Sequence, residues 1–102
     1  MEGMATNDAA GTPEPSPSTI RLLIVDNDRA HAQAMVESLE RDGYQCAMAT
    51  SGPDGLRAVE GDTFDVVVTD LVMNDVDGME VLGRTKEVLP DCEVIMVTGH
   101  AT

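Results

Sequence analysis

The segment at residues 22–28 reads LLIVDND, a short apolar run followed at once by two carboxylates and an amide. Two further runs have the same form, because VVVT at residues 66–69 precedes Asp70 and VIMV at residues 94–97 precedes Thr98. Apolar runs of this kind, without alternation, are typical of strands buried on both faces of a parallel sheet. Ligands of open α/β sheets bind outside the carboxyl ends of the strands. We therefore expect the carboxylates and a hydroxyl to meet at one edge, in a place suited to a divalent cation and a phosphoryl group.

Segments with helical spacing separate the strands. In the first of them the apolar residues fall on one face, and Asp28 is the expected N-cap. Strands alternating with helices imply right-handed βαβ units, so the predicted fold class is α/β with an open parallel sheet. The expected strands are 21–25, 45–50, 65–69 and 93–97, and the expected helices are 29–41, the segment from 52 to about 61, and 79–89.

Composition narrows the classes of function. The chain has 102 residues, enough for one small domain, and a formal net charge of −13. So acidic a chain is unsuited to binding nucleic acid through the phosphate backbone or to binding anionic membrane surfaces. No apolar stretch approaches the roughly 18 residues of a membrane span, and the N-terminus has no signal-peptide pattern. Cys46 and Cys92 lack metal-binding spacing and are interpreted as reduced core thiols, so a cytoplasmic location is expected.

The chain divides into two parts. Residues 1–19 are rich in Pro, Ser and Thr, carry three carboxylates and no Lys or Arg, and are expected to be a disordered acidic tail. Residues 20–102 hold all the predicted strands and helices and are expected to form the folded domain.

Asp70 is the first candidate for chemistry, because a carboxylate at the end of a buried strand is costly unless it is paired or bound to metal. Aspartate can accept a phosphoryl group as an acyl phosphate. Asp26 and Asn27 could supply oxygen ligands to Mg²⁺. The alternative is that these residues only cap helices and turns. His31 and the only lysine, Lys86, are interpreted as surface residues, as is His100.

Three segments together resemble the receiver domain of two-component response regulators. They are residues 22–28, the segment from 65 to 80 that contains Asp70 and ends in DGME, and residues 94–102. The ending TGHAT at residues 98–102 is similar to receivers of the nitrogen-regulatory (NtrC-like) group. The resemblance covers residues 20–102.

The resemblance implies a flavodoxin-like open parallel sheet and a phosphoacceptor at Asp70. It implies a Mg²⁺ site formed by Asp26, Asn27, Asp70 and the backbone carbonyl of Val72, and a switch hydroxyl at Thr98. The implied donor is a sensor histidine kinase or a phosphotransfer protein, and a second copy of the chain could form a homodimer. On this interpretation the chain is a signalling module rather than an independent enzyme.

Three departures from the family pattern affect these expectations. Asn74 stands where the family usually has proline, which should loosen the loop after Asp70. Asn27 replaces a carboxylate, which should lower the affinity for metal. The chain also ends after the fourth predicted strand, so we expect an incomplete receiver of four strands and three helices. The family's lysine on strand five would then be missing, and the stability should be low.

Two alternatives stay open. A receiver fold that has lost its chemistry would be a non-phosphorylated pseudo-receiver that acts only by interaction. The segment at residues 22–28 also fits the Asp-x-Asp motif of haloacid-dehalogenase-like phosphatases, with Asp26 as nucleophile and Asp28 as general acid. Ala30 departs from that motif. Asp70→Asn should abolish phosphate uptake in a receiver, and Asp26→Asn should do so in a phosphatase.

Overall fold

The structure, a computed structural model, describes residues 19–74 and 76–98. The predicted tail lies outside these residues except for Thr19, as does His100. Each predicted strand or helix is present, with bounds that agree within one residue. In chain order the elements are β1 (Arg21–Val25), α1 (Arg29–Arg41), β2 (Gln45–Ala49), α2 (Gly52–Gly61), β3 (Val66–Asp70), α3 (Gly78–Val88) and β4 (Glu93–Val97).

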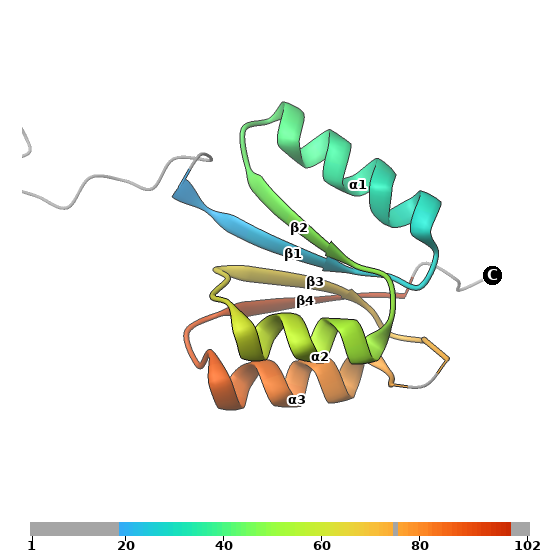
Figure 1. The fold of residues 1–102 in the computed structure, drawn as a ribbon, viewed down its shortest axis with the longest axis vertical. Coiled ribbons are helices and arrows are strands. Elements are labelled where there is room, and N and C mark those ends of the chain that lie inside the picture. The colour runs from blue at the N-terminus through green and yellow to red at the C-terminus, as the bar shows by residue number, and fades with distance from the viewer. Residues whose placement is uncertain (1–18, 75, 99–102) are drawn as a thin grey trace, which may run out of the picture.

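The four strands form one parallel sheet in the order β2-β1-β3-β4. Figure 1 shows α1 on one face of this sheet and α2 and α3 side by side on the other. The prediction of an α/β fold with four parallel strands and three helices is confirmed. The register pairs Val25 of β1 with Thr69 of β3, so the carboxyl ends of these two strands lie at the same level.

Both faces of the sheet are buried, which explains why the strand sequences do not alternate. On the α1 face, Ile24 packs with Ala32 and Val36 of the helix. On the other face, Leu23 and Val25 of β1 belong to a larger core. Neighbouring residues of β1 thus point to opposite faces, and both faces are apolar. That larger core contains Leu23, Val25, Ala49, Val59, Phe64, Val67, Met73, Val81 and Cys92.

Each helix begins at a polar side chain that caps its N-terminus and lies in the segment after the preceding strand. Asp28 accepts a hydrogen bond from the backbone N–H of His31 and begins α1, as predicted. Ser51 caps α2 and Asp77 caps α3 in the same way. Because each cap lies at the carboxyl end of a strand, the helix N-termini gather along one edge of the sheet.

Helix α1 leaves part of its sheet face uncovered. A groove of about 470 Å³ lies beside the helix, and Ile95 of β4 is 52% exposed. The groove is lined by Ile20, Leu22, Met35, Leu39, Tyr44, Val66, Val68, Ile95 and Val97.

Among the residues that the structure describes, no helix is both long enough and apolar enough to cross a membrane.

Candidate functional site

Two buried carboxylates mark the carboxyl edge of the sheet. Asp26 directly follows β1 and is 4% exposed, while Asp70 ends β3 and is 5% exposed. β1 and β3 are neighbours, and the pairing of Val25 with Thr69 places the two aspartates one position further along at the same level. Two carboxylates buried at one edge of a sheet favour a nearby cation, because a buried charge is costly unless it is paired or bound to a metal.

The other predicted site residues lie around this pair with exposed side chains. Asn27 is exposed beside Asp26, and the side chain of Val72 is 65% exposed two residues after Asp70. Thr98 is exposed and directly follows Val97, the residue of β4 that pairs with Asp70. The three residues therefore border the same edge from three different segments.

Asp26 is held by two contacts. Its Oδ1 accepts a hydrogen bond of 2.8 Å from the backbone N–H of Asp28, and its Oδ2 contacts Nδ1 of His31. The backbone of His31 is itself fixed, because its N–H donates to the side chain of Asp28 over 3.1 Å. Side chains in the first turn of a helix lean toward its N-terminus, and this brings the imidazole back onto the end of β1.

His31 is exposed, as its interpretation as a surface residue requires, but its contact with Asp26 was not predicted. The ring is half exposed, but it contacts Asp26, the most deeply buried of the predicted metal ligands. Asp26 and Asp70 together form what we call the acidic edge of the sheet. A spacing of five residues is not a helical repeat, so periodicity alone gave no sign of the contact. The available signal was the position of the histidine, in the first turn of a helix that begins right after a strand ending in aspartate.

The acidic edge changes the basicity of His31. The hydrogen bond with Asp26 raises the pKa of the imidazole above its usual value of 6.5, and the charge of Asp26 adds to the effect. Burial opposes this and lowers the pKa, and the charges of Asp28 and Asp70 raise it by smaller amounts than burial lowers it. The main cause of the raised pKa is therefore the direct contact with Asp26.

The loop after β3 is fixed at both ends. The backbone N–H of Leu71 donates to Val97 over 2.9 Å, and the N–H of Gly78 donates back to Leu71 over 2.8 Å. Gly78 has no room for a side chain, because a Cβ there would lie 2.5 Å from the carbonyl oxygen of Asp70 and 2.6 Å from Sδ of Met96. The backbone of Asp70 is thus held by the start of α3.

The predicted ligands fit a magnesium ion by the chemistry of their donors. Two carboxylates, an amide and a backbone carbonyl are oxygen donors, which Mg²⁺ prefers. Within residues 19–74 and 76–98 there is no group of three or more His, Cys, Asp or Glu side chains arranged to hold a metal. The predicted set is not of that type, because only two of its four donors are carboxylates.

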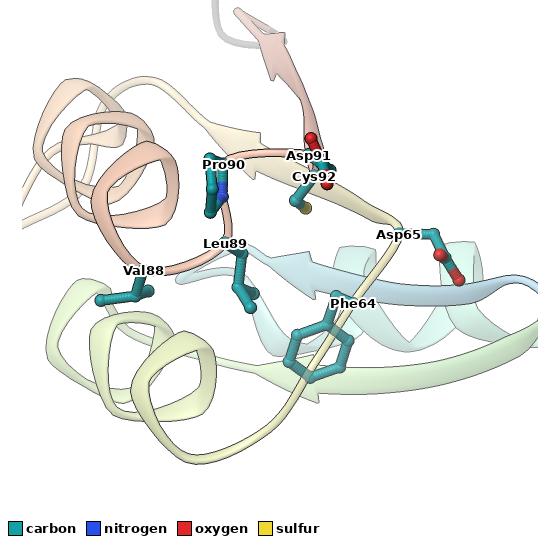
Figure 2. A pocket seen from close by; sticks show the side chains of 7 residues that line it. All are labelled: Phe64, Asp65, Val88, Leu89, Pro90, Asp91 and Cys92. Carbon is teal, nitrogen blue, oxygen red and sulfur yellow. The ribbon is translucent and has the colours of Figure 1, made fainter.

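A second pocket lies at the opposite end of the sheet from Asp26 and Asp70. Burial raises the pKa of the Cys92 thiol there, which disfavours the reactive thiolate. Lys86, predicted to be a solvated charge, donates a hydrogen bond of 2.5 Å to the Cys92 carbonyl. The pocket has a volume of about 210 Å³. Figure 2 shows the side chains that line it: Phe64, Asp65, Val88, Leu89, Pro90, Asp91 and Cys92.

Comparisons with known proteins agree on one family. The family model of the response regulator receiver domain matches residues 22–102. The transcriptional regulatory protein GlrR of Escherichia coli (strain K12) is 35% identical over 79% of this chain and 18% of its own length. The response regulator receiver protein CpdR of Brucella abortus (strain 2308) is 30% identical over 79% of this chain and 68% of its own. The chain therefore spans about a fifth of the first relative and about two thirds of the second.

Solved structures give the same result. A CheY-like receiver domain protein from Methanospirillum hungatei JF-1 superposes with a TM-score of 0.77 and 34% identity, over 81% of this chain and 66% of that one. The response regulator TrrA from Thermotoga maritima, solved in complex with Mg²⁺ and BeF, superposes with a TM-score of 0.75 and 27% identity, over 80% of this chain and 71% of that one.

Proposed function

We propose that this chain, which belongs to the response regulator receiver domain family, accepts a phosphoryl group on Asp70 and changes conformation in response. A response regulator receiver is a signalling module, and the donor proposed here is a phosphohistidine on a sensor histidine kinase or a phosphotransfer protein. We also propose that residues 20–102 form the receiver unit, that residues 1–19 form a separate tail, and that the chain works in the cytoplasm.

The observation that carries the proposal is that Asp70 and Asp26 are both buried at the same edge of the sheet. Both carboxylates are under a tenth exposed and end neighbouring strands. In the proposed reaction, a carboxylate oxygen of Asp70 attacks phosphorus and the bond from phosphorus to the histidine nitrogen breaks. The products are an acyl phosphate and a free histidine, whose ring nitrogen keeps the bonding electrons and takes up a proton.

The remaining carboxylate and its neighbours would hold Mg²⁺. We assign Asp26, Asn27, Asp70 and the carbonyl of Val72 as its ligands, and the bound ion would neutralise charge on the phosphoryl oxygens. Asn27 contributes a neutral oxygen where a carboxylate would contribute a charge, so we expect weak binding of Mg²⁺. The short hydrogen-bonded link between Leu71 and Gly78 keeps the Asp70 backbone in place during the transfer.

Thr98 is the proposed sensor of the phosphoryl group. It is exposed and follows the residue of β4 that pairs with Asp70. A rotation of its side chain toward Asp70 would let the hydroxyl donate to a phosphoryl oxygen. That movement would couple the chemistry at β3 to the end of β4.

Intact-mass spectrometry tests the proposal directly. The chain is incubated with Mg²⁺ and acetyl phosphate, and we expect a mass increase of one phosphoryl group that is absent from Asp70→Asn. Asp91→Asn is the control, because Asp91 is exposed at the opposite end of the sheet. A folded wild-type chain that gains no phosphoryl group would favour a pseudo-receiver.

The same experiment separates the receiver from a phosphatase. Both carboxylate oxygens of Asp26 are engaged, one by the N–H of Asp28 and one by His31, which does not favour Asp26 as a free nucleophile. Phosphorylation that persists in Asp70→Asn and disappears in Asp26→Asn would reverse this assignment.

A further inference from the structure

We propose that the imidazole of His31 is a built-in competitor of the cation, because it occupies the carboxylate oxygen of Asp26 that Mg²⁺ would take. The inference rests on the proposed function in taking Asp26 as a ligand of Mg²⁺. It goes beyond that function by naming the group that holds Asp26 before the ion binds and that must leave when the ion enters. His31 is then a positioning residue that lowers the affinity of the site for Mg²⁺.

The two carboxylate oxygens of Asp26 are held in different ways. Oδ1 accepts a hydrogen bond of 2.8 Å from the backbone N–H of Asp28, the N-cap of α1. That N–H is fixed by the start of the helix and cannot leave without unwinding it. Within the residues that the structure describes, the hydrogen-bond partner of Oδ2 is Nδ1 of His31. Oδ2 is therefore the oxygen that can exchange its partner.

An ion that takes Oδ2 must displace the imidazole. A carboxylate only accepts hydrogen bonds, so Nδ1 of His31 is the donor in this contact. The ring N–H and a cation would place two positive centres against one oxygen, which disfavours binding of both at once. The hydrogen bond from His31 and the bond from Mg²⁺ are thus alternatives at Oδ2 of Asp26.

The ring can leave at little cost to the fold. The His31 side chain is 49% exposed, and its contact with Asp26 is the only hydrogen bond of the ring within residues 19–74 and 76–98. The backbone of His31 is anchored separately, because its N–H donates to the Asp28 side chain over 3.1 Å. A change of rotamer moves the imidazole into solvent while α1 keeps its cap.

The competition sets the size of the expected effect. If Mg²⁺ binds only those chains whose ring has moved out, its apparent affinity is reduced by the fraction of such chains. One net hydrogen bond between half-exposed groups shifts this equilibrium by roughly two- to tenfold. Weak binding of Mg²⁺ would then have two separate causes, the neutral oxygen of Asn27 and the hydrogen bond from His31.

Calorimetric titration of the full chain with Mg²⁺, at one fixed pH, tests the assignment. The affinity should rise about two- to tenfold in His31→Ala, which is the opposite of what loss of a ligand would cause. Gln33→Ala is the matched control, because Gln33 is exposed on the same helix and bonds Glu37 instead of the acidic edge. It should leave the affinity unchanged, and Asp26→Asn should abolish binding. Circular dichroism checks that each variant folds.

Nuclear magnetic resonance gives a second measurement that needs no substitution of His31. Saturation of the wild type with Mg²⁺ should move the ring signals of His31 toward their positions in metal-free Asp26→Asn, where the carboxylate is absent. His100→Ala separates the signals of the two histidines. A purely structural role of His31 would leave its ring signals unmoved by the ion.

The outcomes distinguish this inference from the proposed function. Binding of Mg²⁺ that depends on Asp26 but is equal or weaker in His31→Ala would overturn the role of His31 and leave the cation site intact. Ring signals of His31 that do not move on saturation would overturn it as well. If no Mg²⁺ binds through Asp26 in the wild type or in His31→Ala, both the cation site and the inference are wrong, whereas phosphorylation of Asp70 is judged separately by mass.

Discussion

Nδ1 of His31 contacts Oδ2 of Asp26, so the first turn of α1 places a base against the end of β1. The contact joins a half-exposed ring to a carboxylate that is 5% exposed. It depends on the helix beginning at Arg29, immediately after the Asp28 cap. A helix that began one residue later would rotate the imidazole by about 100° away from the acidic edge.

The first prediction concerns the titration of His31. Its folded-state pKa should exceed 6.5, because the hydrogen bond to Asp26 and the surrounding carboxylates favour the imidazolium. A pKa raised by folding contributes stability that is fully present below the unfolded value of about 6.5. This stability is lost as the pH rises through the folded-state pKa. Nuclear magnetic resonance titration of the ring protons in wild type and Asp26→Asn measures the shift.

Asp26→Asn should lower the pKa of His31, since it removes the main acceptor and its charge. His100→Ala assigns the two histidine signals without altering the contact. A His31 pKa that is the same in wild type and Asp26→Asn would show that the contact does not form in solution.

The second prediction compares two glycines of α3. A Cβ at Gly78 would lie 2.5 Å from the carbonyl oxygen of Asp70, whereas a Cβ at Gly83 meets nothing within 4 Å. Gly78→Ala should therefore lower the free energy of unfolding by about 1–3 kcal/mol, the usual cost of overpacking. Gly83→Ala should raise it by roughly 0.5–1 kcal/mol, since alanine favours the helix.

Urea denaturation of both variants measures these changes. The pair controls for helix propensity, because both substitutions replace glycine by alanine in the same helix. Equal effects of the two substitutions would mean that the start of α3 does not pack against Asp70 as the structure shows.

Sequence patterns predict the fold almost completely, and a particular reason can be given for each success. The run at residues 22–25 lies in the centre of the sheet between β2 and β3, so both faces are buried and the apolar pattern is continuous. The Asp28 cap follows from local hydrogen bonding alone. Asp26 and Asp70 come together because they end neighbouring parallel strands.

The parts of the site that the sequence did not reveal depend on side-chain directions. The contact of His31 with Asp26 is set by the direction in which the first helical turn points, which no repeat in the sequence reports. Lys86 is exposed, as a solvated charge should be, but its Nζ also donates a hydrogen bond of 2.5 Å to the Cys92 carbonyl, because the chain reverses after α3. Both contacts join residues five or six positions apart at the ends of elements, where no helical or strand repeat predicts them.

The third prediction concerns acid stability at the amino end of the sheet. Arg21 donates two hydrogen bonds to Asp62, at 2.8 and 3.0 Å, and this contact lowers the pKa of Asp62 from 3.8 to about 2. A depressed pKa contributes stability that is present above the unfolded value and lost as the pH falls toward the folded one. Wild type should therefore be more stable than Asp62→Asn at pH 6, and the difference should shrink between about pH 4 and pH 2.

Urea denaturation at several pH values follows this difference. Asp54→Asn is a suitable comparison, because Asp54 pairs with Arg57 within α2 and does not connect two elements. A stability difference between wild type and Asp62→Asn that stays constant down to pH 2 would contradict the prediction.

The last prediction concerns the lifetime of the proposed acyl phosphate. The Val72 side chain is 65% exposed and lies two residues after Asp70, where it cannot hydrogen-bond a water that attacks phosphorus. Val72→Asn supplies a donor and an acceptor there, and one hydrogen bond of about 0.5–1.5 kcal/mol to the attacking water gives roughly a two- to tenfold faster hydrolysis. Loss of the phosphoryl adduct with time, followed by intact mass, measures the rate.

Ile95→Thr is the control for this measurement. Ile95 is similarly exposed, at 52%, but lies in the middle of β4, two residues before the position that pairs with Asp70. Its replacement should leave the hydrolysis rate unchanged, since its side chain does not border the carboxyl edge of the sheet. An unchanged rate in Val72→Asn would show that the residue two positions after the phosphoacceptor does not control water in this receiver, and the exposed valine would then need another explanation.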